Sequence, residues 1–275
     1  MNRKKPTLFP LYIGFILTLM YVPIVLVIIY SFNHSRLSSA WGGFSLYWYA
    51  ELFRDRAMFE GLRTSLLLAL QSSCLAAILG TLGASGMARV RLSSQTARKW
   101  SGSFHKTMES LSILPIMTPE IIMGMTFLAF FSLLSLPPGI FTLVIAHTAF
   151  CVPYPYLLVR ARLAGIDKSY VEAARIMGAS DLRAFYDITI PLMLPAIISG
   201  ILISFAMSFD DVIVSSFVAG VDTNTLPMII YSRLKAGVTP KTNAMCTLIF
   251  AFTVILCLAA AFFARNQAEK RTIDI

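Results

Sequence analysis

Six long apolar segments, separated by polar connections, dominate the pattern along this chain of 275 residues. They are residues 8–32, 64–88, 111–136, 140–159, 191–221 and 243–264. Each is long enough to cross the hydrocarbon core of a bilayer, because a helix needs roughly 20 mostly apolar residues to span about 30 Å. The pattern predicts an all-α integral membrane protein with six transmembrane helices in a single domain, residues 1–275. Gly80, Gly83 and Gly86 in the second segment are expected to let another helix approach closely.

The composition excludes a soluble enzyme and a disordered chain. Hydrophobic residues make up 57% of the sequence and charged residues 13%, whereas a soluble domain has about 45–50% and about 25%. Disorder needs low hydrophobicity and high net charge. The four cysteines lie in the apolar segments without paired spacing, so we expect no disulfide framework, no metal site and no cofactor.

The positive charges predict the orientation. All 23 Lys and Arg residues lie outside the six segments, sixteen on the side of the two termini and seven on the other. The positive-inside rule places the richer side, and therefore both termini, in the cytoplasm. The net charge of +9 is then a matter of topology and needs no nucleic-acid partner. The first segment is 25 residues long and no Ala-x-Ala site follows it, so we expect a retained span and not a signal peptide.

Three acidic residues lie inside predicted spans, where ionisable groups are costly and are functional candidates. They are Glu120, Asp210 and Asp211. Along straight helices, Glu120 and Asp210 would lie at depths of roughly 14 and 22 Å. No basic residue in a span can neutralise these acids, so we expect a pathway that suits a cation.

Structural interpretations of the same acids stay open. Thr118, Pro119 and Glu120 follow the pattern of a helix start, with Thr as cap and Pro at the first position, so Glu120 is alternatively the beginning of the second half of a broken span. Adjacent Asp210 and Asp211 point about 100° apart on a helix, so one of them can instead cap or pair with a neighbouring span.

Polar residues elsewhere in the spans are expected to be structural. His147 is predicted to be packed and hydrogen-bonded and is assigned no metal. The hydroxyls of Ser208, Ser215 and Ser216 are expected to bond to the backbone of their own helix. Trp48, in the connection after the first span, is either an interfacial anchor or part of an entrance that attracts an organic cation through its ring face.

The connection of residues 160–190, called the elbow below, predicts two short helices on the cytoplasmic side. Ser169 and Glu172 have the spacing of a capping box, and Gly178 suits the position just after a helix end. Ser180 or Asp181 is expected to cap the second short helix, which leads towards Pro191.

These residues resemble a known signature. Glu172-Ala173-Ala174, then Gly178, then Ile188-Thr189-Ile190-Pro191 is similar to the EAA-x₃-G-x₉-I-x-L-P motif of type I ABC-importer permeases, with Ile190 in place of the usual Leu. The resemblance implies that the elbow is a coupling helix that docks on a cytoplasmic ATPase. By that resemblance Glu172, Ala173, Ala174 and Gly178 form the ATPase contact.

The similarity extends to permeases of spermidine/putrescine importers. The stretches that carry it are YSFNHSRLSSAWGGFSLYWY, PIMTPEIIMG, AHTAFCVPY, FAMSFDDVIVSSFVAG and TLPMIIYSRLKAGVTP. This resemblance implies a bacterial inner-membrane subunit that works with a second homologous permease, two ATPase subunits and a periplasmic polyamine-binding protein. A permease for another small cation or metabolite is the alternative within the same family.

Two other classes compete with a non-catalytic transport subunit. An ion-coupled secondary transporter would use Asp210 and Asp211 as a relay, and an intramembrane enzyme would need paired carboxylates or a Ser/His pair. The sequence contains no G-x-x-x-x-G-K-[ST] loop, so a partner must bind the ATP. The elbow has a purpose only in the transport subunit, which is the function that the sequence favours.

Overall fold

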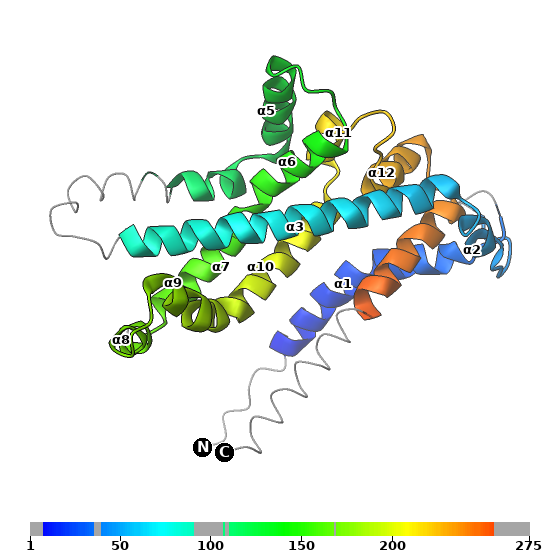
Figure 1. Ribbon diagram of the computed structural model, residues 1–275. Coiled ribbons are helices and arrows are strands. Elements are labelled where there is room, and N and C mark those ends of the chain that lie inside the picture. Colours follow the sequence, from blue (N-terminus) through cyan, green and yellow to red (C-terminus); the bar gives the residue numbers. More distant parts are fainter. Residues whose placement is uncertain (1–7, 36–39, 91–106, 108–109, 168, 256–275) are drawn as a thin grey trace, which may run out of the picture. The chain divides into compact units, whose positions relative to one another are not determined.

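The computed structural model describes residues 8–35, 40–90, 107, 110–167 and 169–255 (Figure 1). In these ranges the regular structure is helical apart from one isolated β-bridge between Asn33 and Phe44, so the predicted all-α class is confirmed. The chain divides into two compact units. One comprises Met1–Met58 with Ile230–Ile275, and the other comprises Phe59–Ile229.

The first unit contains α1 (Leu8–Ser31), α2 (Tyr47–Leu52), the end of α12 (Leu226–Ala236) and the helix Pro240–Ile255. The turn between α1 and α2 is built around the buried side chain of Asn33. Its Oδ1 accepts hydrogen bonds from the N–H groups of Ser35 and Gly42, at 3.2 and 2.7 Å, and its amide nitrogen donates to the Ala40 carbonyl at 2.7 Å. The Ser31 and Tyr49 hydroxyls lie 2.6 Å apart and join the two helices.

A cluster of ion pairs around Asp55 joins the N-terminal and C-terminal segments of this unit. Asp55 Oδ2 lies 2.8 Å from Arg233 and 2.9 Å from Lys241, and Lys241 lies 3.8 Å from Glu51. Burial alone raises the pKa of Asp55, but hydrogen bonds from Lys241 and Arg233 outweigh it, so the pKa lies below its ordinary value. Ionised Asp55 therefore stabilises the fold above its ordinary pKa of about 3.9, and this contribution is lost as the pH falls through the lower folded-state pKa.

Asp55→Asn is expected to destabilise the protein by about 2 kcal/mol at pH 7, since hydrogen bonds between charged groups contribute about 1.5–3 kcal/mol. The loss is expected to shrink as the pH falls through the folded-state pKa of Asp55. Thermal unfolding of the purified protein in detergent, measured across pH, tests this. Glu51→Gln is the matched control: its longer, more exposed pair predicts a smaller change. An equal loss at acidic and neutral pH would contradict the prediction.

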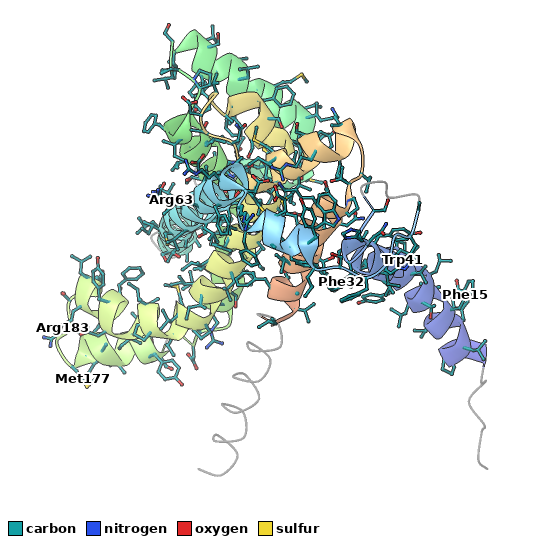
Figure 2. The ribbon with its side chains drawn as sticks, turned by 90° about the vertical axis from the view of Figure 1, so that its right-hand side faces the viewer. Phe15, Phe32, Trp41, Arg63, Met177 and Arg183 are labelled. Carbon is teal, nitrogen blue, oxygen red and sulfur yellow. The ribbon has the colours of Figure 1, made fainter. Side chains whose placement is uncertain are left out.

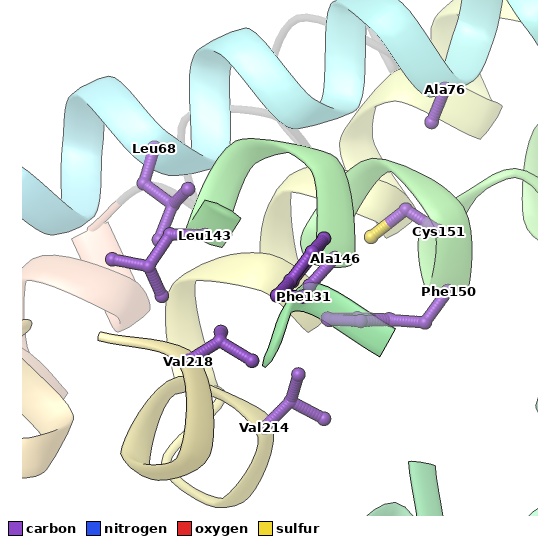
Figure 3. Close-up of a cluster of buried hydrophobic side chains, with 9 residues drawn as sticks. All are labelled: Leu68, Ala76, Phe131, Leu143, Ala146, Phe150, Cys151, Val214 and Val218. Carbon is purple, nitrogen blue, oxygen red and sulfur yellow. The ribbon is translucent and has the colours of Figure 1, made fainter. Parts of the chain in front are cut away.

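The second unit contains two apolar clusters, and four helices contribute to the larger one. These are α3 (Arg56–Val90), α5 (Glu120–Leu133), α6 (Ile140–Cys151) and α11 (Ile213–Val218), and α10 (Ile190–Asp210) contacts α6. The core side chains come from α3, α5, α6 and α11 (Figure 3): Leu68, Ala76, Phe131, Leu143, Ala146, Phe150, Cys151, Val214 and Val218. On α3 they are eight residues apart, and on α6 successive ones are three, four and one residues apart, as expected for the buried stripe of a helix.

The predicted spans are found with breaks that a hydropathy window does not show. Within the residues that the structure describes, four helices are long and apolar enough to cross a membrane, and a bent pair, counted as one span, makes a fifth. The pair is Ser110–Met117 with Glu120–Leu133, bent by 112° inside the predicted span 111–136. The predicted span 191–221 is likewise interrupted, between α10 and α11. The six-span count stays a prediction, since the last segment, 243–264, extends beyond the described residues.

Glycines bring α7 (Pro153–Ala164) into close contact with α3 and α10. A Cβ on Gly200 would lie 2.7 Å from Pro155 Cα and Cβ, and one on Gly80 would lie 2.8 Å from the Tyr156 nitrogen. Gly83 faces the Tyr156 ring at 3.6 Å. The expected close approach is therefore confirmed for Gly80, whereas at Gly83 a Cβ would make only an ordinary contact. For Gly86 it is wrong, because a Cβ there has nothing within 4 Å among the residues described.

Gly200→Ala is expected to lower the free energy of unfolding by about 1–3 kcal/mol, the usual cost of overpacking a rigid site. The proline it meets cannot rotate away, because its ring is part of the backbone. Gly86→Ala is the matched control, since it adds the same methyl group to open space and removes a helix-interior glycine. Thermal unfolding in detergent compares the two. An unchanged midpoint in the Gly200 variant would show that α7 and α10 shift apart without cost.

Candidate functional site

The break between α10 and α11 separates the two adjacent acids. α10 ends at Asp210, and Asp211 is extended, with φ −67° and ψ 128°. Asp211 Oδ1 accepts from the Val214 N–H at 3.2 Å, and Oδ2 accepts from the N–H and the hydroxyl of Ser215, both at 2.7 Å. The side chain is only 5% exposed. Asp211 therefore caps α11, and both of its oxygens are engaged within the chain.

A buried polar network continues from Asp211 through three more helices. His147 Nε2 on α6 lies 3.0 Å from Ser215 Oγ and 3.5 Å from Asp211 Oδ2. His147 Nδ1 lies 2.8 Å from Ser208 Oγ on α10, which lies 2.9 Å from Ser72 Oγ on α3. The predicted role of His147 as a packed, hydrogen-bonded residue is confirmed.

The serine predictions have a mixed outcome. Ser216 bonds to the Val212 carbonyl of its own helix at 2.6 Å, as expected. For Ser208 and Ser215 the prediction is wrong, because their hydroxyls bond to other side chains. The serine, histidine and aspartate are arranged in the order of a nucleophilic triad. However, His147, Ser208 and Ser215 are buried, so a substrate carbonyl has no approach to either hydroxyl.

Asp210 and Glu120 differ from Asp211. Both side chains are exposed, and neither has a hydrogen-bond or ion-pair partner in the part of the chain that the structure describes. Glu120 is the first residue of α5, directly after the 112° bend. Glu120 therefore begins a second helix after a break, as the structural interpretation expects, and a depth counted along a straight helix does not apply to it. Thr118 is not the cap, because its hydroxyl bonds back to the Leu114 carbonyl at 2.8 Å.

Trp48 lies on α2, where its indole N–H donates to the Asn33 carbonyl at 2.9 Å. The edge-to-face contact with Tyr47, 5.0 Å between ring centroids, also orients its ring. These contacts fix Trp48 to the turn between α1 and α2, next to the stacked rings of Phe32 and Phe44. They hold the indole within this turn, and both predicted roles, the interfacial anchor and the cation entrance, stay predictions.

The elbow contains α8 (Ser169–Ile176), α9 (Asp181–Ala184) and a π-helical turn, η1 (Phe185–Thr189). Gly178 has φ +86°, and its N–H bonds to the Arg175 carbonyl while the Ala179 N–H bonds to the Ala174 carbonyl. This is a Schellman helix end, as the sequence predicts. Ser180 caps α9 through the Arg183 N–H at 3.3 Å.

The start of α8 differs from the predicted capping box. Ser169 is already the first helical residue, and its N–H donates to Asp167 Oδ1 at 2.9 Å. This hydrogen bond lowers the pKa of the Asp167 carboxyl. The acceptor is therefore Asp167, which the S-x-x-E pattern does not include.

The surface of the elbow is more apolar than its motif suggests. Glu172, Ala173 and Gly178 are exposed, whereas Ala174 is buried within this chain. Figure 2 shows Met177 and Arg183 at the tip of the elbow. Large apolar side chains are exposed around them: Tyr170, Ile176, Met177, Leu182 and Tyr186. Sequence reasoning missed this apolar surface, although the adjacent pair Ile176-Met177 just before Gly178 was its visible signal.

Comparison with known proteins assigns the chain to a protein family. The family model described as "Binding-protein-dependent transport system inner membrane component" matches residues 90–274. The chain belongs to this family. It is therefore an inner-membrane permease, and of the three classes the non-catalytic transport subunit is the one that agrees with the comparison.

Similar proteins cover nearly the whole permease. The putrescine transport system permease protein PotI of Escherichia coli K12 is 36% identical over 271 residues, covering 96% of this chain and 92% of that protein. The spermidine/putrescine transport system permease protein PotC of the same strain is 33% identical over 256 residues, covering 93% of each chain.

Solved structures confirm the fold of ABC-importer permeases. A chain of a bacterial ABC transporter that imports alginate has a TM-score of 0.69 at 15% identity, covering 96% of this permease and 99% of that chain. A chain of the MetNI methionine transporter has a TM-score of 0.61 at 17% identity, covering 74% and 92%. As a component of an ABC importer, the permease works with ATPase and permease partners.

Proposed function

We propose that this permease imports polyamines, spermidine or putrescine, from the periplasm to the cytoplasm. The observation that carries the proposal is its similarity, over more than nine-tenths of the chain, to permeases that are named for these substrates. The electrostatics of the spans agree with it. A polyamine is a flexible cation, and a pathway with acids but no bases offers it countercharges.

Within this proposal Asp210 and Glu120 are the acids that meet the cargo. Both are exposed, and both lie where a span is broken: Asp210 at the end of α10 and Glu120 at the start of α5. Asp211 supports the pathway through its capping of α11, because its oxygens already receive three hydrogen bonds. Trp48 contributes by fixing the turn after α1.

The proposed complex contains a second homologous permease, two cytoplasmic ATPase subunits and a periplasmic polyamine-binding protein. Both termini and the elbow then face the cytoplasm, in agreement with the sixteen basic residues on that side. Glu172, Ala173 and Gly178 are exposed on the elbow and meet the ATPase, whereas the buried Ala174 fixes α8 to the rest of the elbow.

ATP hydrolysis by the purified complex in nanodiscs tests the proposal. Putrescine- or spermidine-loaded binding protein is expected to stimulate hydrolysis above the rate with the empty binding protein. Uptake into proteoliposomes is expected to require the ATPase subunits and to survive an uncoupler. Stimulation by a different small cation and its binding protein, but by neither polyamine, would move the permease to the alternative substrate class.

A further inference from the structure

Asp210 and Asp211 are adjacent in one predicted span, but only the Asp210 side chain is exposed. The buried hydrogen-bond network around His147 accounts for this difference. It connects α3, α6, α10 and α11 through Ser72, His147, Ser208 and Ser215, and it ends on Asp211. Asp210, the next residue along the chain, takes no part in it.

Counting hydrogens assigns a direction to the bonds that join Asp211, Ser215 and His147. Ser215 donates its hydroxyl hydrogen to Asp211 Oδ2, so its oxygen accepts from His147 Nε2, which must carry the hydrogen of a neutral ring. His147 Nδ1 then accepts from the Ser208 hydroxyl, whereas Ser72, 2.9 Å from Ser208 Oγ, also has the Leu68 carbonyl at 2.7 Å as an acceptor for its one hydrogen. Every polar atom of the imidazole is therefore used.

Burial makes this arrangement hard to rearrange. His147, Ser72 and Ser215 have no exposed surface, and Leu143 and Cys151 flank His147 one turn away on either side. Removing one partner would leave a buried polar group unpaired, which costs more than the hydrogen bond itself contributes. The break between α10 and α11 is therefore tied to two other helices as well as capped locally.

We propose that His147 is a positioning residue for the cargo pathway. Its bond to Ser215 keeps Asp211 turned into the core as the cap of α11, and the extended backbone at Asp211 then presents Asp210 to the pathway. The inference deepens the proposed function, and it rests on that function only for the identity of the cargo.

Two substitutions of His147 separate positioning from general stability. The amide of His147→Asn reaches the place of Nδ1, so it keeps the bond to Ser208 and loses the link to Ser215. The longer His147→Gln reaches the place of Nε2, so it retains a donor to Ser215. Ser215→Ala and Ser215→Thr form a second pair, without and with the hydroxyl, which decides the question if the histidine variants do not assemble.

The first measurement needs no cargo. In the assembled transporter with its four native cysteines replaced by alanine, Asp210→Cys is labelled with a small cationic methanethiosulfonate reagent. We expect labelling when residue 147 is the native histidine or glutamine, and a rate about tenfold lower with His147→Asn, the factor that corresponds to the loss of about one hydrogen bond. Asp222→Cys, in the exposed loop after α11, is the control and is expected to be indifferent to residue 147.

The second measurement is polyamine uptake in a double-mutant cycle. If His147 acts through Asp210, adding His147→Asn to Asp210→Asn causes no further loss, whereas with Glu120→Gln the two losses multiply. Equal labelling of Asp210→Cys in the His147 and His147→Asn proteins, or no labelling while Asp222→Cys reacts, would overturn the inference. Absence of polyamine uptake by the wild-type complex would instead refute the proposed cargo, and the labelling result would still decide the role of His147.

Discussion

Putrescine uptake through the Asp210→Asn variant is expected to fall about tenfold or more, because a hydrogen bond to a charged group contributes about 1.5–3 kcal/mol. The exposed carboxylate of Asp210 lies at the end of α10, inside a predicted span without Lys or Arg. A cationic amine that passes this point has few other countercharges. The substitution keeps the size of the side chain and removes only its charge. Uptake of labelled putrescine into proteoliposomes that contain the assembled complex measures the effect.

Three further variants serve as controls for the Asp210→Asn measurement. Asp222→Asn removes an acid from the exposed loop after α11 and is expected to leave uptake near the wild-type rate. Asp210→Glu retains the charge and is expected to keep most of the uptake. Asp211→Asn is expected to lower thermal stability as well, because it weakens a helix cap that contributes about 1 kcal/mol. If Asp210→Asn and Asp222→Asn take up putrescine at the same rate, the proposed role of Asp210 in the cargo pathway is wrong.

The sequence predicted features that depend on neighbours in the chain. Apolar segments of sufficient length located the spans, and Pro119 with Glu120 indicated the start of a helix inside one of them. The Schellman end at Gly178 and the Ser180 cap were predictable for the same reason, since both involve residues within one or two turns. Local chemistry is visible in a local pattern.

The polar network was not predictable in this way. Ser72 and Ser208 are 136 positions apart, and His147 and Ser208 are 61 apart, so their contacts arise only when four helices pack. The sequence showed that Asp210 and Asp211 point in different directions but not which one turns inward. That choice depends on Ser215 and His147. Ala174 is a similar case, because its burial depends on how α8 packs within the elbow and is invisible in the adjacent pair Ala173-Ala174.

Replacing Ile176 and Met177 together with serine is expected to weaken binding of the ATPase to the permease about a hundredfold or more, because burying each such side chain contributes about 1.5–3 kcal/mol. Their exposed fractions in this chain are 87% and 80%. Ile176 is the last residue of α8, Met177 follows it, and Gly178, at φ +86°, turns the backbone sharply after them. Two large apolar side chains at a rigid tip are costly in water and favourable in an apolar groove, which the proposed ATPase partner would supply.

Binding of the purified ATPase subunit to nanodisc-embedded permease measures this effect. Val221→Ser is the matched control, since that side chain is 93% exposed in the loop after α11, far along the chain from the elbow. The Ile176 and Met177 substitutions lie outside the predicted spans, so we expect membrane insertion and thermal stability to stay unchanged. Wild-type affinity in the double variant, with a loss in Glu172→Gln, would place the ATPase contact on the polar face of α8. The coupling motif would then act through its charge and not through the apolar tip that follows it.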